Sequence, residues 1–174
     1  MPHMSRLLPA LAALLALTGC GLTPMYAGGA QSATAQGVAA VAVPAIEGRG
    51  GWLLKNALEA RLGVANSRGG QTAPQYRLDV RLDDSLEALG VLNDDTITRE
   101  RRILRARYQL VDIASGAVLL DATAGSDAGI DVVSSEYATI AAEQKALENL
   151  ALEVADRMAT QIALTLKAQA NTQP

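Results

Sequence analysis

Four arginines recur at odd-numbered positions within a stretch that alternates polar and apolar residues. Successive side chains of an extended strand point to opposite faces, so Arg99, Arg101, Arg105 and Arg107 would share one face over about 25 Å. A guanidinium presents a planar fork of N–H donors that matches phosphate and carboxylate oxygens. The spacing therefore indicates a strip of cations that could bind a phosphate- or carboxylate-bearing ligand.

A purely structural reading of these arginines is also open. Acidic residues alternate with arginine on the preceding strand, and Asp121 follows on the next one. One register sets Asp79 opposite Arg105, Asp83 opposite Arg101 and Arg77 opposite Arg107, while Asp121 neutralises Arg107. Cross-strand ion pairs would then stabilise a solvated face that needs no ligand.

The only cysteine ends an apolar N-terminal run. The run from Leu7 to Leu17 is too short to span a bilayer and has the dimensions of a signal-peptide core. It leads into Leu17, Thr18, Gly19 and Cys20, which resemble a bacterial lipobox. There the thiol receives a diacylglycerol, and cleavage before it frees an amine for a third acyl chain, expected to be palmitate. We expect residues 1–19 to be a lipoprotein signal peptide and Cys20 to be the lipidation site and membrane anchor.

Position 21 is Gly rather than Asp. By similarity to enterobacterial sorting rules, this permits export to the outer membrane. We expect a lipid-anchored protein of the outer membrane that faces the periplasm.

Cleavage before Cys20 would remove His3, the only histidine. Catalysis by Ser-His-Asp or Cys-His, and metal sites built on His or Cys, are then excluded. The net charge of −3 and an aromatic content of 3% argue against a nucleic-acid partner. We therefore expect no enzyme, no cofactor and no metal.

Three further patterns point to chemistry less specifically. The run Asn93-Asp94-Asp95 with Asp83 and Asp84 could suggest a calcium loop, but EF-hand spacing is absent. A carboxylate-based hydrolase would need two converging acids, and no spacing specifies such a pair. Ser134-Ser135 precedes a helical pattern, so a helix-capping role is favoured over a nucleophilic one.

Composition divides the remaining chain into three parts. Residues 20–37 are small and polar after the cysteine and predict a flexible tether. Residues 38–167 are long enough for one hydrophobic core and predict a single domain. Residues 168–174 are polar and predict a frayed tail.

Periodicity predicts the elements of that domain. An apolar run over 38–43, stopped by Pro44, favours a buried strand, and the three glycines within 47–51 favour a loop. Helical spacing predicts a helix over 52–62 and another of about thirty residues from 134 onward. Alternation predicts strands over 76–83, 97–113 and 118–124, with a hairpin turn at Ser115-Gly116 between the last two.

The element order is strand, helix, three strands, helix. A strand-helix-strand connection makes the first pair parallel, and hairpins make the others antiparallel. We expect an α+β two-layer fold in which a mixed four-stranded sheet carries both helices on one face. The other face would stay open to water or to a partner.

Several segments, in this order and spacing, resemble the lipopolysaccharide-assembly lipoprotein family LptE in its alphaproteobacterial form. They are Leu17–Tyr26, Tyr76–Val80, Ala106–Asp112 and Tyr137–Glu143. The resemblance covers most of residues 17–167. It implies a lipoprotein that plugs the LptD β-barrel, assists the barrel's assembly, binds lipopolysaccharide and helps deliver it to the outer leaflet.

The sequence departs from the family in one loop. Better-known members carry basic residues between the second and third strands, whereas residues 90–95 here are acidic. Lipopolysaccharide contacts therefore do not transfer residue by residue. Our hypothesis is that Arg99, Arg101, Arg105 and Arg107 take their place.

An alternative function is an accessory lipoprotein of an ABC-type lipid-transport system. It would also combine a lipobox with a small α/β domain, but it would associate with an inner-membrane complex rather than with a barrel.

Overall fold

Four strands and three helices make up the described part of the chain. The computed structural model describes residues 33–63, 73–91 and 97–171, all within one compact unit, Ala33–Pro174. In chain order, the elements are α2 (Ala33–Ala39), β1 (Val41–Ala42), α3 (Gly48–Leu62), β2 (Tyr76–Val91), β3 (Ile97–Asp112), β4 (Val118–Asp131) and α5 (Glu136–Ala170).

The strands form one sheet in the order β1-β2-β3-β4. Strand β1 is parallel to β2, and the other two pairs are antiparallel. Gly116, at φ 72°, takes the left-handed conformation in the β3–β4 turn, which glycine adopts without strain. The predicted mixed four-stranded sheet and α+β class are confirmed.

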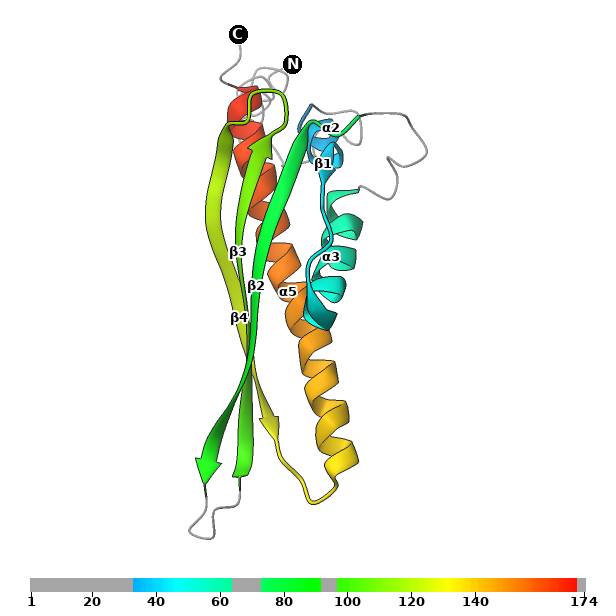
Figure 1. Cartoon of the computed structure of the whole chain (residues 1–174), viewed down its shortest axis with the longest axis vertical. Coiled ribbons are helices and arrows are strands. Elements are labelled where there is room, and N and C mark those ends of the chain that lie inside the picture. Colours follow the sequence, from blue (N-terminus) through cyan, green and yellow to red (C-terminus); the bar gives the residue numbers. More distant parts are fainter. Residues whose placement is uncertain (1–32, 64–72, 92–96, 172–174) are drawn as a thin grey trace, which may run out of the picture. The chain divides into compact units, whose positions relative to one another are not determined.

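Helices α3 and α5 lie on the same side of the sheet, and β2, β3 and β4 present their other side outward (Figure 1). Alternation puts the apolar side chains of β3 against the helices, and Leu104, Ala106, Tyr108 and Leu110 are at most 1% exposed. The stripe predicted along α5 supplies the other half of the core, with Leu147, Leu150, Val154, Met158, Ile162 and Leu166 all buried.

Ile140 belongs to the same predicted stripe, yet it is 43% exposed. The first turn of α3 lies level with Gln144 and Leu147 of α5, since these residues line one hollow together. Ile140 is one turn nearer the start of α5, beyond the N-terminal end of α3. The apolar stripe of α5 therefore extends past the part of the helix that α3 covers.

Two local predictions near the N-terminus were wrong. The run 38–43 is not one strand, because α2 extends to Ala39 and only Val41–Ala42 pair with β2. The glycines of 47–51 do not form a loop but the first turn of α3. A Cβ on Gly51 would lie 2.6 Å from the Ile46 carbonyl oxygen, so this glycine serves close packing.

The register between β2 and β3 differs by four residues from the one that would pair Asp79 with Arg105. Asp79 lies opposite Gln109, Asp83 opposite Arg105, and Arg81 opposite Arg107. An even shift keeps every side chain on its face, so the apolar pattern is satisfied in either register. Strands β2 and β4 also run beyond their predicted ends, to Val91 and Asp131.

The outer boundaries of the folded unit lie outside those predicted. Helix α2 begins at Ala33, within the predicted tether, and packs on α5, where Gly37 lies beside Leu166. Helix α5 continues to Ala170, past residue 167. At its other end, the Ser135 hydroxyl accepts from the Ala138 N–H at 3.4 Å, which confirms the predicted capping role. None of the described helices is long and apolar enough to cross a membrane.

Candidate functional site

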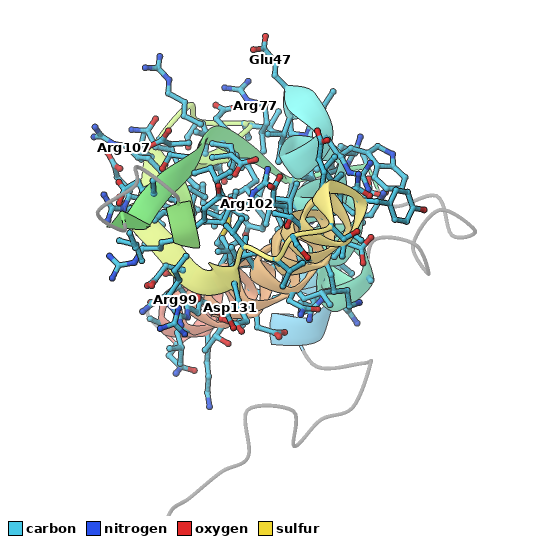
Figure 2. All side chains as sticks on the ribbon, turned by 90° about the horizontal axis from the view of Figure 1, so that it is seen from below. Glu47, Arg77, Arg99, Arg102, Arg107 and Asp131 are labelled. Carbon is cyan, nitrogen blue, oxygen red and sulfur yellow. The ribbon has the colours of Figure 1, made fainter. Side chains whose placement is uncertain are left out.

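The open face of the sheet carries the arginines singled out from the sequence. Since the even-numbered residues of β3 pack on the helices, its odd-numbered residues must point the other way. Arg99, Arg101, Arg105 and Arg107 are all exposed on that side. Figure 2 shows Arg107 on the side of the sheet away from α5, whereas Arg102 lies between the sheet and the helices.

Three of these arginines are paired with acids of β4. Arg99 lies 3.3 Å from Asp131, Arg101 3.6 Å from Asp127, and Arg107 3.2 Å from Asp121. Figure 2 shows Arg99 and Asp131 together at the edge of the molecule. All of these side chains are at least 40% exposed, so solvent screens each pair and its contribution to stability is small. Such pairs are weak enough for a ligand to compete with them.

Arg105 has no such partner. Its position faces Asp83 on β2 and Gly125 on β4, and its Cγ lies 3.5 Å from the point where a Cβ on Gly125 would be. In the described part of the chain, no carboxylate oxygen lies within 4.0 Å of its guanidinium. Arg105 is therefore the member of the predicted set that is already available to an anion.

The ion pair between Arg107 and Asp121 shifts the pKa of both groups. Asp121 accepts from Arg107 Nη2 at 3.2 Å and from Gln109 Nε2 at 2.8 Å. These hydrogen bonds favour the ionised carboxylate and hold the pKa of Asp121 below its usual value. The same bond raises the pKa of Arg107. Both groups therefore stay charged at neutral pH.

Sequence reasoning did not single out Arg81 on β2. Its odd-numbered position puts it on the open face together with Arg77, but alternation does not show what lies opposite it. The register sets it directly across from Arg107. Arg77 instead forms a two-pronged pair with Asp79, at 2.9 Å for both Nε and Nη2.

A hollow of about 470 Å³ opens beside Arg81. It lies where the chain leaves β1 and passes the edge of β2, so its wall is Pro44, Ala45 and Ile46. Polar groups of the open face also line it, namely those of Asp79, Arg81, Arg107 and Gln109, together with Leu78, Val80 and Tyr108 of the same strands. The volume falls in the range of small-molecule sites.

The remaining candidate residues are those of the possible calcium loop and those of the lipobox. Asp83 and Asp84 point to opposite faces, and Asp84 binds Arg102 on the helix side. Among the described residues no group of three or more His, Cys, Asp or Glu side chains could hold a metal ion. The segment 93–95, and the lipobox residues Leu17, Thr18, Gly19 and Cys20, lie outside the described residues.

Comparison with known proteins adds independent information. The family described as LptE, lipopolysaccharide-assembly, matches residues 38–162. No curated protein matches the chain. A candidate lipoprotein of Caulobacter crescentus CB15 is similar in structure, with 25% identity and a TM-score of 0.63 over 77% of this chain and 96% of that one.

Two further solved structures share the fold at lower identity. Rare lipoprotein B of Shewanella oneidensis is 11% identical, with a TM-score of 0.57 over 77% of this chain and 97% of its own. Lipoprotein B of Nitrosomonas europaea is 12% identical, with a TM-score of 0.55 over 76% of this chain and 86% of its own.

Proposed function

The chain belongs to the LptE family of lipopolysaccharide-assembly proteins, and from this premise we propose that it plugs an LptD-type β-barrel, assists the barrel's assembly and takes part in delivering lipopolysaccharide to the outer leaflet. Family membership supports the role in lipopolysaccharide transport. The barrel, the outer-membrane location and the non-catalytic role belong to the proposal.

The observation that carries the proposal is the composition of the open sheet face. Arginines and acids occur there in equal numbers and cover all three long strands, while no large apolar side chain dominates it. The arginines are Arg77, Arg81, Arg99, Arg101, Arg105 and Arg107, and the acids are Asp79, Asp83, Glu87, Asp121, Asp127 and Asp131. A surface of this kind suits the polar lumen of a barrel, where an apolar face would not be solvated.

Lipopolysaccharide contact is assigned within the proposal to Arg99, Arg101, Arg105 and Arg107. Guanidinium groups bind phosphate through paired charge-assisted hydrogen bonds. Arg105 is free of carboxylates among the described residues, and the others hold theirs through exposed, weak pairs. The strip can therefore exchange protein carboxylates for lipid phosphates without a large loss of stability.

Membrane attachment is assigned to acyl chains on Cys20. The motif Leu17-Thr18-Gly19-Cys20 supports this, as does the lipoprotein character of the similar structures. Two or more chains give stable anchoring, since each buried methylene contributes about 0.8 kcal/mol.

The test is affinity purification of the tagged, full-length protein from detergent-solubilised outer membranes, with partners identified by mass spectrometry. The proposal expects a large β-barrel protein in stoichiometric amount. A Cys20→Ala variant is the control, and we expect it to be lost from the membrane fraction. Recovery with an inner-membrane ATPase complex, or with no partner, would contradict the plug role and favour an accessory lipoprotein of an ABC-type system.

A further inference from the structure

One row of paired positions across the open face carries two cations and no acid. Arg81 on β2 lies opposite Arg107 on β3, and the next position across, on β4, is Thr123. Like charges directly opposite each other on a sheet destabilise the pairing. Such an arrangement is stabilised when an anion binds between the two groups.

Two carboxylates near Arg81 already have partners. Asp79 accepts two hydrogen bonds from Arg77, and Asp121 accepts from both Arg107 and Gln109. Arg81 itself has no carboxylate within ion-pair distance in the described part of the chain. Its diagonal neighbour Arg105 shares this property. Asp83, the remaining acid here, faces Arg105 across the two strands, so Arg81 is the cation whose position faces no acid.

The hollow beside Arg81 combines this charge with an apolar wall. Arg81 and Arg107 line it on the sheet side, and Pro44, Ala45 and Ile46 line it on the other. Asp79 also borders the hollow, but Arg77 matches its charge. A ligand that fits would place an anionic group at the arginines and an apolar part against the wall.

Phosphate suits the two arginines better than carboxylate does. A single guanidinium fork satisfies both oxygens of a carboxylate. Here two forks start from paired positions on neighbouring strands, about 5 Å apart. A terminal phosphate offers three oxygens and up to two negative charges, so it can accept from both forks at once.

We propose that the hollow between Arg81, Arg107 and the Pro44–Ile46 wall is a binding site for the phosphate-bearing end of an amphiphile. The inference rests on the proposed function and deepens it, because phosphorylated lipopolysaccharide is such a ligand. It assigns the specific phosphate contact to Arg81, outside the strip on β3.

The experiment measures binding by the full-length, lipidated protein in detergent. The probes are purified lipopolysaccharide, the same material after phosphatase treatment, and inorganic phosphate. The variants are Arg81→Gln and Arg81→Lys. Arg49→Gln is the matched control, because Arg49 is an exposed arginine of α3, away from the open face and outside the strip.

We expect Arg81→Gln to weaken binding of the phosphorylated probe about tenfold, the loss typical of one charge-assisted hydrogen bond. Binding of the dephosphorylated probe should stay within about twofold. Arg81→Lys should be intermediate, since an ammonium keeps the charge but loses the fork. Arg49→Gln should change neither affinity more than about twofold.

Several outcomes would overturn the inference. Unchanged binding by Arg81→Gln, or an equal loss in Arg49→Gln, would show that the hollow has no specific role. Competition by inorganic phosphate as strong as that by the lipid would make it a site for free phosphate. Loss of barrel co-purification in Arg81→Gln with lipid binding intact would assign the hollow to a carboxylate of the barrel.

Two controls keep these results interpretable. Thermal unfolding checks that Arg81→Gln is folded, and Arg81→Lys, which retains the charge, supplies the comparison if it is not. Failure of the wild-type protein to bind lipopolysaccharide would contradict the proposed function itself. That result differs from wild-type binding that Arg81→Gln leaves unchanged, which would contradict the hollow alone.

Discussion

Arg102 on β3 donates to both carboxylate oxygens of Asp84 on β2, at 2.8 and 2.7 Å, and also to the Glu143 carbonyl oxygen of α5 at 3.2 Å. One guanidinium thus joins two strands and a helix on the inner side of the sheet (Figure 2). Its side chain is only 18% exposed.

Replacing this arginine should therefore destabilise the fold. We expect Arg102→Ala to lower the free energy of unfolding by about 1–3 kcal/mol, because Asp84 and the Glu143 carbonyl lose a partly buried, charged donor. Arg99→Ala removes an exposed pair and should cost less than about 1 kcal/mol. Denaturant unfolding of both variants compares them. Equal losses would mean that Arg102 has no special structural role.

Two adjacent glycines of α3 should respond oppositely to alanine. A Cβ at Gly51 would lie 2.6 Å from the Ile46 carbonyl oxygen, so Gly51→Ala must displace backbone and should destabilise by about 1–3 kcal/mol. At Gly50 the nearest atom would be 3.4 Å away, in the flexible side chain of Leu82. Gly50→Ala should be neutral, or stabilising by up to about 1 kcal/mol through helix propensity. Thermal unfolding distinguishes them, and a tolerated Gly51→Ala would show that the close approach is not required.

Acid should weaken the link between the two long helices. Arg61 on α3 donates to both oxygens of Asp156 on α5, through Nη2 at 2.9 Å and through Nε. This hydrogen bonding, more than the charge alone, lowers the pKa of Asp156 in the folded protein. A lowered folded-state pKa contributes stability above the ordinary carboxyl range, and that contribution is lost as pH falls through the folded value.

The measurement is the free energy of unfolding between neutral pH and about pH 3, a range that crosses the usual carboxyl pKa. Asp156→Asn and Arg61→Gln should each flatten the acid side of the curve, and the double variant should flatten it no further. Because Asp156 is 63% exposed, the effect should stay below about 1 kcal/mol. Additive effects of the two single changes would show that the groups act independently.

Reversing the charge of the predicted lipid-binding strip tests its role. Arg101→Glu combined with Arg105→Glu should reduce lipopolysaccharide binding at least tenfold, because two favourable contacts become repulsive. Both side chains are exposed, so circular dichroism should show an intact fold. Arg49→Glu, at an exposed position of α3 away from the open face, is the control. Full lipid binding by the folded double variant would remove these arginines from the site.

The alternation of residue types was sufficient to predict the sheet and its faces. In β3, apolar even positions and charged odd positions leave only one orientation against the helices, and the same holds for the stripe of α5. The glycines of α3 led to the wrong prediction of a loop. Glycine is needed at position 51 because the backbone there lies against the Ile46 carbonyl group, and no local sequence pattern indicates that contact.

The site was predictable only in part, for a geometric reason. Alternation placed Arg105 and Arg107 on the open face, but a register shift by four residues leaves every face unchanged. Which arginines have an acid opposite them depends wholly on that register. Only the structure shows that Arg81 faces Arg107 and that Arg105 faces Asp83.

The most direct test of the account is depletion of this protein in the living cell, followed by measurement of lipopolysaccharide at the cell surface. We predict that surface lipopolysaccharide falls and that the partner barrel accumulates in a misassembled form. Restoration by the wild-type protein, but not by Cys20→Ala, should follow. Unchanged surface lipopolysaccharide and a normally assembled barrel after depletion would contradict the proposed role.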